Sequence, residues 1–203
     1  MSRWGTRRGA GLKRRVGALV VVIAVAVLAA VLAVPTVKRF VRELTYPLSD
    51  VSIINQDAAR EHLDPALVAA VIYAESKFDP RPSSAGALGL MQIEPSTAIL
   101  LAQKSGGTLF TIADLAHPAT NIAYGSYYLR YLLHNYGGNR TLALAAYNAG
   151  PTNVNRWIAK AKAQGRTLDR DAIPFPQTRA YVAKVEAATK TYRRYYAKLL
   201  GPP

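Results

Sequence analysis

One carboxylate, Glu75, has a sequence environment that suits acid–base chemistry. It follows an apolar run, residues 67–74, and precedes a glycine-rich stretch, residues 83–92. The run starts after a capping aspartate, Asp64, and a proline, which is typical of a first helical turn, and a second Asp-Pro pair at 79–80 is expected to stop the helix. Glu75 is therefore predicted to lie near a helix end, beside a loop.

The spacing of the apolar residues places Glu75 on the buried side of this helix. Val68, Val71 and Ile72 lie seven, four and three residues before it, so the carboxylate continues the stripe that faces the core. Burial disfavours the charged carboxylate and can raise its pKa from about 4.3 toward roughly 6 to 7, which suits a general acid near neutral pH. The helix by itself favours a simpler alternative, a structural carboxylate satisfied by hydrogen bonds.

Separate polar and glycine-containing segments further along the chain reverse that preference. Gly86 and Gly89 allow tight backbone conformations and a close approach to a ligand, with which Gln92 could form a hydrogen bond. The later segments are residues 121–125 with 128–129, residues 146–151 and residues 173–182. Together they favour a functional site that includes Glu75.

Four motifs in these segments resemble the catalytic domain of the family 1 soluble lytic transglycosylases, a branch of the lysozyme superfamily related to goose-type lysozyme. The resemblance covers roughly residues 46–198 and rests on Glu75-Ser76, Gly89–Gln92, Ala146–Gly150 and Thr178–Val182, in that order. It implies that Glu75 is the catalytic acid and base. The substrate-binding residues that it implies are Ser83, Gln92, Tyr147, Asn148, Gln177 and Tyr181.

The resemblance also implies a reaction that needs one carboxylate, whereas glycosidases usually need two. In a lytic transglycosylase the C6 hydroxyl of N-acetylmuramic acid attacks its own C1 and forms a 1,6-anhydro ring, so the substrate supplies the nucleophile. Glu75 would protonate the oxygen between N-acetylmuramic acid and N-acetylglucosamine, then accept the proton of that hydroxyl. The expected function is a carbon–oxygen lyase that acts on peptidoglycan glycan strands in cell-wall remodelling.

Two positions depart from the family pattern. Gln177 occupies a place where many members have Glu, so no acidic role is assigned to it. Glu94 stands where the family often has an apolar residue such as Met, and we expect it to cap the helix that starts at Pro95, where a negative charge suits the helix dipole.

Two other functions remain open from the sequence. A lysozyme-like muramidase would use water and leave a reducing end, and Asp79 or Glu94 placed close enough to Glu75 to hold a water would favour it. A catalytically silent peptidoglycan-binding tether would keep the groove without the reaction. The presence of Glu75, Ser83, Gln92 and Tyr147 together argues against the tether.

The N-terminal sequence predicts a membrane anchor. Residues 1–15 carry six basic residues, and Val16–Val34 is an apolar run of 19 residues. At about 1.5 Å per residue this run reaches roughly 28 Å, close to the thickness of a hydrocarbon core. Three basic residues follow it, so the positive-inside rule predicts a single-pass protein with a cytoplasmic tail and its domain on the wall side of the cell membrane. A cleaved signal peptide is the alternative, because residues 24–26 offer a small-residue cleavage site.

Charge, cysteine and histidine content exclude several other classes. Nine of the 26 basic residues lie in the first 42 positions, so most of the net charge of +14 reflects membrane topology rather than nucleic-acid binding. The absence of cysteine excludes disulfides, a thiol nucleophile and lipidation of a lipobox cysteine. His62, His117 and His134 lack metal-ligand spacing. We expect no metal, cofactor or nucleic-acid partner, and no protein-partner motif is visible.

The remaining chain predicts an all-α domain over residues 46–203, after a linker at 35–45, and the resemblance implies that this domain is lysozyme-like. Its length, about 150 residues, is enough for one domain with one core. Prolines open three predicted helices, at Pro95, Pro118 and Pro151, and glycines 137–138 stop the second. Residues 178–200 are predicted as a last amphipathic helix. A short hairpin is expected within residues 83–92.

Overall fold

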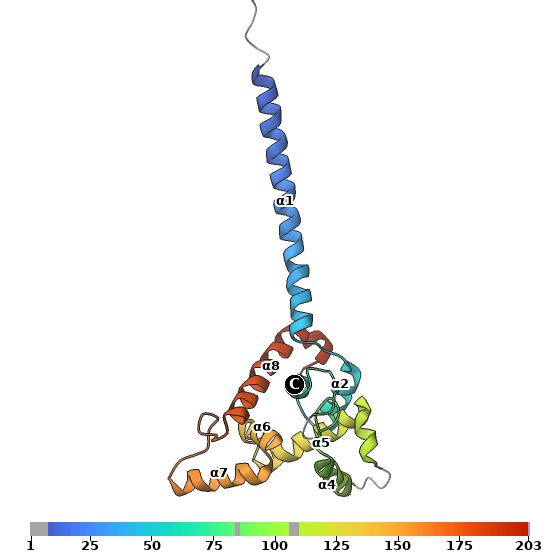
Figure 1. The fold of residues 1–203 in the computed structure, drawn as a ribbon, viewed down its shortest axis with the longest axis vertical. Coiled ribbons are helices and arrows are strands. Elements are labelled where there is room, and N and C mark those ends of the chain that lie inside the picture. Colours follow the sequence, from blue (N-terminus) through green and yellow to red (C-terminus); the bar gives the residue numbers. More distant parts are fainter. Residues whose placement is uncertain (1–7, 84–85, 106–109, 203) are drawn as a thin grey trace, which may run out of the picture. The chain divides into compact units, whose positions relative to one another are not determined.

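The structure is a computed structural model that describes residues 8–83, 86–105 and 110–202. It divides into two compact parts, Met1–Thr45 and Tyr46–Pro203 (Figure 1).

The described portion of the first part is one helix, α1, Arg8–Thr45. Residues 35–45, predicted as a linker, are its last turns, and Arg39 Nε there contacts Glu43 Oε1 at 2.8 Å. Among the residues that could be searched, no helix combines the length and the apolar character needed to cross a membrane. Six side chains of the predicted anchor lie outside the described residues, namely Val16, Ala18, Val21, Ala24, Ala26 and Leu28.

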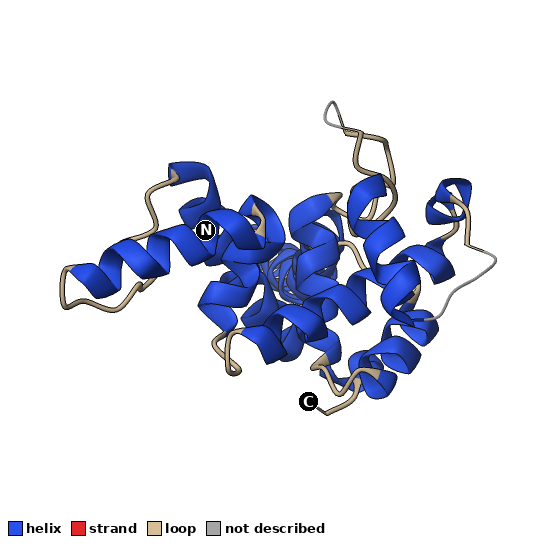
Figure 2. Cartoon of the chain, turned by 90° about the horizontal axis from the view of Figure 1, so that it is seen from below, coloured by secondary structure: helices blue, strands red, loops and turns tan. Residues whose placement is uncertain are grey.

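The second part is helical, as predicted (Figure 2). Its elements are α2 Val51–Arg60, α3 Pro65–Glu75, α4 Pro95–Ser105, the 3₁₀ helix η1 Ile112–Ala116, α5 Pro118–Asn135, α6 Arg140–Ala149, α7 Pro151–Ala163 and α8 Pro176–Leu200. Extended pairing within the described residues is limited to one isolated antiparallel bridge between Leu88 and Ile93. In place of the predicted short hairpin, the described residues of this loop form this one bridge.

Local signals explain which helices the sequence predicted. Prolines open α4, α5 and α7 as expected, and Gly137 and Gly138 follow α5 with positive φ angles of 60° and 80°. The last helix starts two residues earlier than predicted, at Pro176. Helix α2 was not predicted, because no proline opens it, and Asp50 before it is left-handed and provides no side-chain cap. Helix α6 was not predicted either, although Asn139 caps it by accepting from Leu142 N.

The central helix α3 is enclosed by the domain. Every residue from Pro65 to Ile72 is buried, so the predicted one-sided stripe was wrong and α3 contacts neighbours all around, chiefly α8. It ends at Glu75, four residues before the expected stop, because Lys77 and Phe78 adopt left-handed φ angles of 53° and 64°. Glu75 therefore occupies the helix terminus itself.

The long helix α8 packs against the start of the domain. Tyr192 Oη donates to Pro47 O at 2.6 Å, and Tyr196 Oη donates to Tyr46 O at 2.9 Å. Both tyrosines are buried, whereas the neighbouring Tyr195 is 46% exposed. The predicted amphipathic character of this helix is confirmed.

Candidate active site

Glu75 is surrounded by tyrosines from two other helices. Its Oε1 accepts a 2.7 Å hydrogen bond from Tyr181 Oη of α8. Burial and the Glu75 charge raise the pKa of Tyr181 and of Tyr147, on α6, well above the ordinary value. Both hydroxyls therefore stay protonated near neutral pH and act as hydrogen-bond donors.

Burial raises the pKa of Glu75 from an ordinary value of 4.5 to about 7. The hydrogen bond from Tyr181 and the charge of Lys184 both act in the opposite direction, but desolvation outweighs them. Near neutral pH the protonated and ionised forms are both well populated. One carboxyl group can then serve as an acid in one step and as a base in the next.

The loop between residues 86 and 93 is held by one buried amide, Asn121. Its Oδ1 accepts from Met91 N at 2.7 Å, and its Nδ2 donates to Leu88 O at 2.9 Å and to Leu115 O at 3.0 Å. The contacts with residues 88 and 91 join α5 to this loop across about 30 positions of the sequence. Gly89 is required here because its φ is +74° and an added Cβ would lie 2.1 Å from Asn121 Nδ2.

Met91 connects this loop to the tyrosine beside Glu75. Its carbonyl accepts from Tyr147 Oη at 3.0 Å, and its side chain packs against Gly125, where an added Cβ would lie 2.3 Å from Met91 Sδ. Ser76 Oγ, at the end of α3, donates to Leu90 O at 2.7 Å. The loop is therefore bonded to the ends of α3 and α6 as well as to α5.

The structure places the other predicted substrate-binding residues in bonds that order the backbone. Gln92 has a φ of +47°, and its Nε2 donates to Gly89 O at 2.7 Å and to Arg81 O at 3.0 Å. Ser83 Oγ accepts from Ala87 N at 3.0 Å. Asn148 Oδ1 accepts from Thr178 Oγ1 at 2.9 Å and so joins the end of α6 to the start of α8.

The remaining predicted residues differ in their surroundings. Gln177 is exposed in the first turn of α8. Glu94 is also exposed and directly precedes α4, where its carbonyl accepts from Ala98 N at 2.9 Å. Asp79 pairs with Arg81. Tyr181 and Lys184 are the side chains that shift the pKa of Glu75, and neither Asp79 nor Glu94 is among them.

Lys184 is a functional neighbour of Glu75 that the sequence motifs did not indicate. Its Nζ donates to Ala74 O at 2.8 Å, and its charge lowers the pKa of Glu75. The available signal was its position one helical turn after Tyr181, on the same face of α8.

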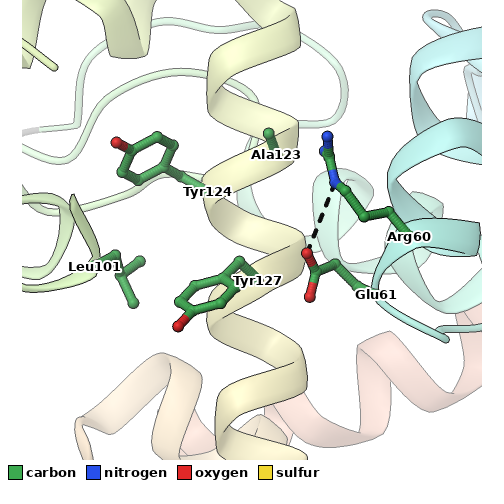
Figure 3. A pocket seen from close by; sticks show the side chains of 6 residues that line it. All are labelled: Arg60, Glu61, Leu101, Ala123, Tyr124 and Tyr127. Carbon is green, nitrogen blue, oxygen red and sulfur yellow. Dashed lines mark ion pairs between the residues drawn. The ribbon is translucent and has the colours of Figure 1, made fainter. Parts of the chain in front are cut away.

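A cavity of about 180 Å³ lies elsewhere in the domain, and Glu75 is not among the residues that line it (Figure 3). It is lined by Arg60, Glu61, Leu101, Ala123, Tyr124 and Tyr127. Glu61 Oε2 accepts from Arg130 Nε at 2.6 Å, and its Oε1 lies 3.7 Å from Arg60 Nε. This carboxylate is therefore paired with two guanidinium groups of the protein itself.

No cluster of three or more His, Asp or Glu side chains in the described portion of the chain is arranged to hold a metal ion. The groups that the structure places beside Glu75 are the hydroxyls of Tyr147 and Tyr181 and the ammonium of Lys184.

Comparisons with known proteins identify the family of this chain. The family described as "Transglycosylase SLT domain" matches residues 52–169. The soluble lytic murein transglycosylase of Salmonella typhimurium is 34% identical over 167 residues, which cover 78% of this chain and 24% of the relative.

Two solved structures have the same fold. The lytic transglycosylase Slt of Pseudomonas aeruginosa, solved as an inactive glutamate-to-glutamine mutant, matches with a TM-score of 0.69 and 32% identity and covers 80% of this chain and 26% of its own. The 70 kDa soluble lytic transglycosylase of Escherichia coli matches with a TM-score of 0.69 and 30% identity, over 79% of this chain and 28% of its own.

This chain spans about a quarter of the length of these three relatives. The family match nevertheless covers more than half of it, and the similarity to the Salmonella protein extends over 78% of it. The chain therefore belongs to the Transglycosylase SLT domain family.

Proposed function

We propose that this protein is a peptidoglycan lytic transglycosylase that cleaves the β-1,4 bond between N-acetylmuramic acid and N-acetylglucosamine. The observation that carries the proposal is Glu75, a carboxyl group with a pKa of about 7 that accepts a hydrogen bond from Tyr181. Family membership and the inactivity of the glutamate-to-glutamine Pseudomonas relative support it.

Protonated Glu75 starts the reaction by donating its proton to the glycosidic oxygen. Because Tyr181 occupies Oε1, we assign this proton to Oε2. The bond between C1 of N-acetylmuramic acid and the leaving oxygen then breaks, and positive charge develops at C1. The ionised carboxylate that remains is stabilised by Tyr181 and by the nearby ammonium of Lys184.

The second step closes the anhydro ring. The C6 hydroxyl of the same sugar attacks C1, and Glu75 accepts its proton, so the carboxyl group returns to its starting state. No water is consumed. The products are a strand that ends in N-acetylglucosamine and a strand that ends in 1,6-anhydro-N-acetylmuramic acid.

Mass spectrometry of the released muropeptides tests this reaction. Full-length protein incubated with purified peptidoglycan is expected to release muropeptides that are one water lighter than hydrolysed products. Reducing-end products would instead identify a muramidase. A folded sample that binds peptidoglycan and releases nothing would identify the tether.

We also propose that Val16–Val34 anchors the protein in the cell membrane, with the N-terminus in the cytoplasm and the second part on the wall side. The support is the sequence: an apolar run of 19 residues that six basic residues precede and three follow. Anchoring would keep the enzyme beside its insoluble substrate.

Membrane extraction tests the anchor. The full chain is expected to remain in the membrane pellet after alkaline carbonate and to dissolve in detergent. The double substitution Val22→Arg and Val27→Arg should release most of the protein from the pellet. Each arginine near the centre of a span makes membrane insertion less favourable by about 2.5–3.5 kcal/mol. Val37→Arg, outside the run, is the matched control and should stay in the pellet. A shortened wild-type chain in the soluble fraction would instead indicate a cleaved signal peptide.

A further inference from the structure

The C-terminal end of α3 needs hydrogen-bond partners because the last carbonyl groups of a helix have none within it. Ile72 O accepts from Ser76 N at 2.9 Å, and Tyr73 O accepts from Lys77 N at 3.1 Å. The next carbonyl, that of Ala74, would normally accept from residue 78. The left-handed conformations of Lys77 and Phe78 turn the chain away from the helix at this point.

Lys184 supplies the partner of that carbonyl from another helix. Its Nζ donates to Ala74 O at 2.8 Å and lies 5.1 Å from the centre of the Tyr73 ring, on whose face a cation is favoured. The Ala74 carbonyl belongs to the peptide group whose nitrogen is that of Glu75. Lys184 therefore holds the backbone from which the Glu75 side chain projects.

Tyr181 and Lys184 act on Glu75 from one face of α8. They are three residues apart, so they lie one turn from each other. Tyr181 binds the Glu75 carboxylate, and Lys184 binds the peptide group before it. One helix thus constrains both ends of the Glu75 residue.

We propose that Lys184 is a positioning residue for Glu75, one that fixes the end of α3 and supplies the positive charge needed when the buried carboxylate ionises. The inference rests on the proposed catalytic role of Glu75. A positive group at a helix C-terminus is also favourable in itself, because the helix dipole places negative charge there.

The charges around the pair agree with this role. Glu75 is faced by Tyr181 and Lys184 from α8 and by Tyr147 from α6. Burial raises the pKa of Glu75, and the Lys184 charge lowers it. Burial and Lys77 lower the pKa of Lys184, whereas Glu75 raises it. Without Lys184, the hydrogen bond from Tyr181 would be the main interaction left to oppose the rise that burial causes in the pKa of Glu75.

A direct titration of Glu75 tests the electrostatic part of the proposal. The chain has five glutamates, so labelling the side-chain carboxyl carbon of glutamate with ¹³C gives few NMR signals. The signal that is missing in Glu75→Gln is that of Glu75. In full-length protein, Lys184→Met is expected to raise the titration midpoint of Glu75 by about one pH unit. Lys184→Arg should keep it near the wild-type value. Lys190→Met, exposed on the same helix, is the matched control and should not change it.

The activity profile tests positioning. Because the first step needs protonated Glu75, activity falls as the pH rises through the pKa of Glu75. In Lys184→Met the pKa of Glu75 is expected to be higher, so this loss of activity should occur at a higher pH. We expect its kcat to fall about tenfold with an unchanged KM, and Lys184→Arg to recover most of the loss.

An unchanged midpoint in Lys184→Met, or an equal shift in Lys190→Met, would overturn the proposal. If Lys184→Met does not fold, Lys184→Gln replaces it, because the amide retains a donor for Ala74 O and lacks the charge. A raised midpoint in that variant supports the proposal, and an unchanged one refutes it. The titration requires no turnover, so it separates this inference from the proposed function: an absence of anhydro products leaves the NMR result interpretable.

Discussion

Glu75→Gln is expected to reduce the release of anhydro-muropeptides by at least about 10³-fold while leaving peptidoglycan binding nearly unchanged. General acid and base catalysis each contribute typically about 10²–10⁴-fold, and the proposed mechanism assigns both steps to this residue. The amide has nearly the shape of the carboxyl group, so ground-state contacts survive. The measurement is the rate of release by mass spectrometry, beside a sedimentation assay for binding.

Glu94→Gln is the matched control for this experiment. Glu94 is an exposed glutamate directly before α4, and its replacement should leave the rate within a few-fold of wild type. A substantial residual rate in Glu75→Gln would remove Glu75 from the catalytic role. A large loss in Glu94→Gln would instead point to a second carboxylate and to water as the nucleophile.

Glu75→Gln should increase the stability of the folded protein at alkaline pH, although it removes activity. Because the folded-state pKa of Glu75 is raised to about 7, the folded protein loses stability as the pH rises from about 4.5 through 7. Above pH 7 the cost of the buried carboxylate is on the order of 1–3 kcal/mol. Glu75→Gln should therefore unfold at a higher temperature than wild type at pH 8, and the difference should shrink toward pH 5. Thermal unfolding at the two pH values measures it.

Asn121→Ala is expected to lower the free energy of unfolding by about 2–4 kcal/mol and to reduce activity strongly. The substitution removes three hydrogen bonds of a fully buried side chain and leaves Met91 N, Leu88 O and Leu115 O without those partners. Each unpaired buried polar group lowers the free energy of unfolding by about 1–3 kcal/mol, and local rearrangement that restores a hydrogen bond reduces this loss. The loop should loosen, and Tyr147 should lose the fixed carbonyl of Met91.

Ser126→Ala, on the same helix, separates this effect from a general sensitivity of α5. Ser126 is also buried, but its hydroxyl has no hydrogen-bond partner among the residues that the structure describes. Its removal should be neutral or slightly stabilising. Urea unfolding of both variants, with muropeptide release measured in parallel, provides the comparison. Equal stability losses, or full activity in Asn121→Ala, would contradict the role assigned to this amide.

Much of the helical framework could be predicted because its signals are local. Proline is favoured in a first helical turn, and prolines do start α4, α5 and α7. α2 begins at Val51 without a proline, and it was missed. Asp50 before it is a residue type that often caps helices, but it makes no cap bond here. The end of α3 was misplaced by four residues because the left-handed conformations at Lys77 and Phe78 are not marked by glycine.

The sequence by itself determined that Glu75 lies near the end of an apolar helix, beside a glycine-rich loop, and its four ordered motifs indicated the family. Tertiary structure alone decided which groups meet at that residue. Tyr181 lies 106 positions away, Lys184 donates to the carbonyl of Ala74 across 110 positions, and Asn121 reaches Met91 across 30. The physical reason is that burial and hydrogen bonds depend on distance in space. Local periodicity specifies which helices form, whereas the packing of α8 and α5 around α3 and its loop determines the pKa and position of the carboxylate.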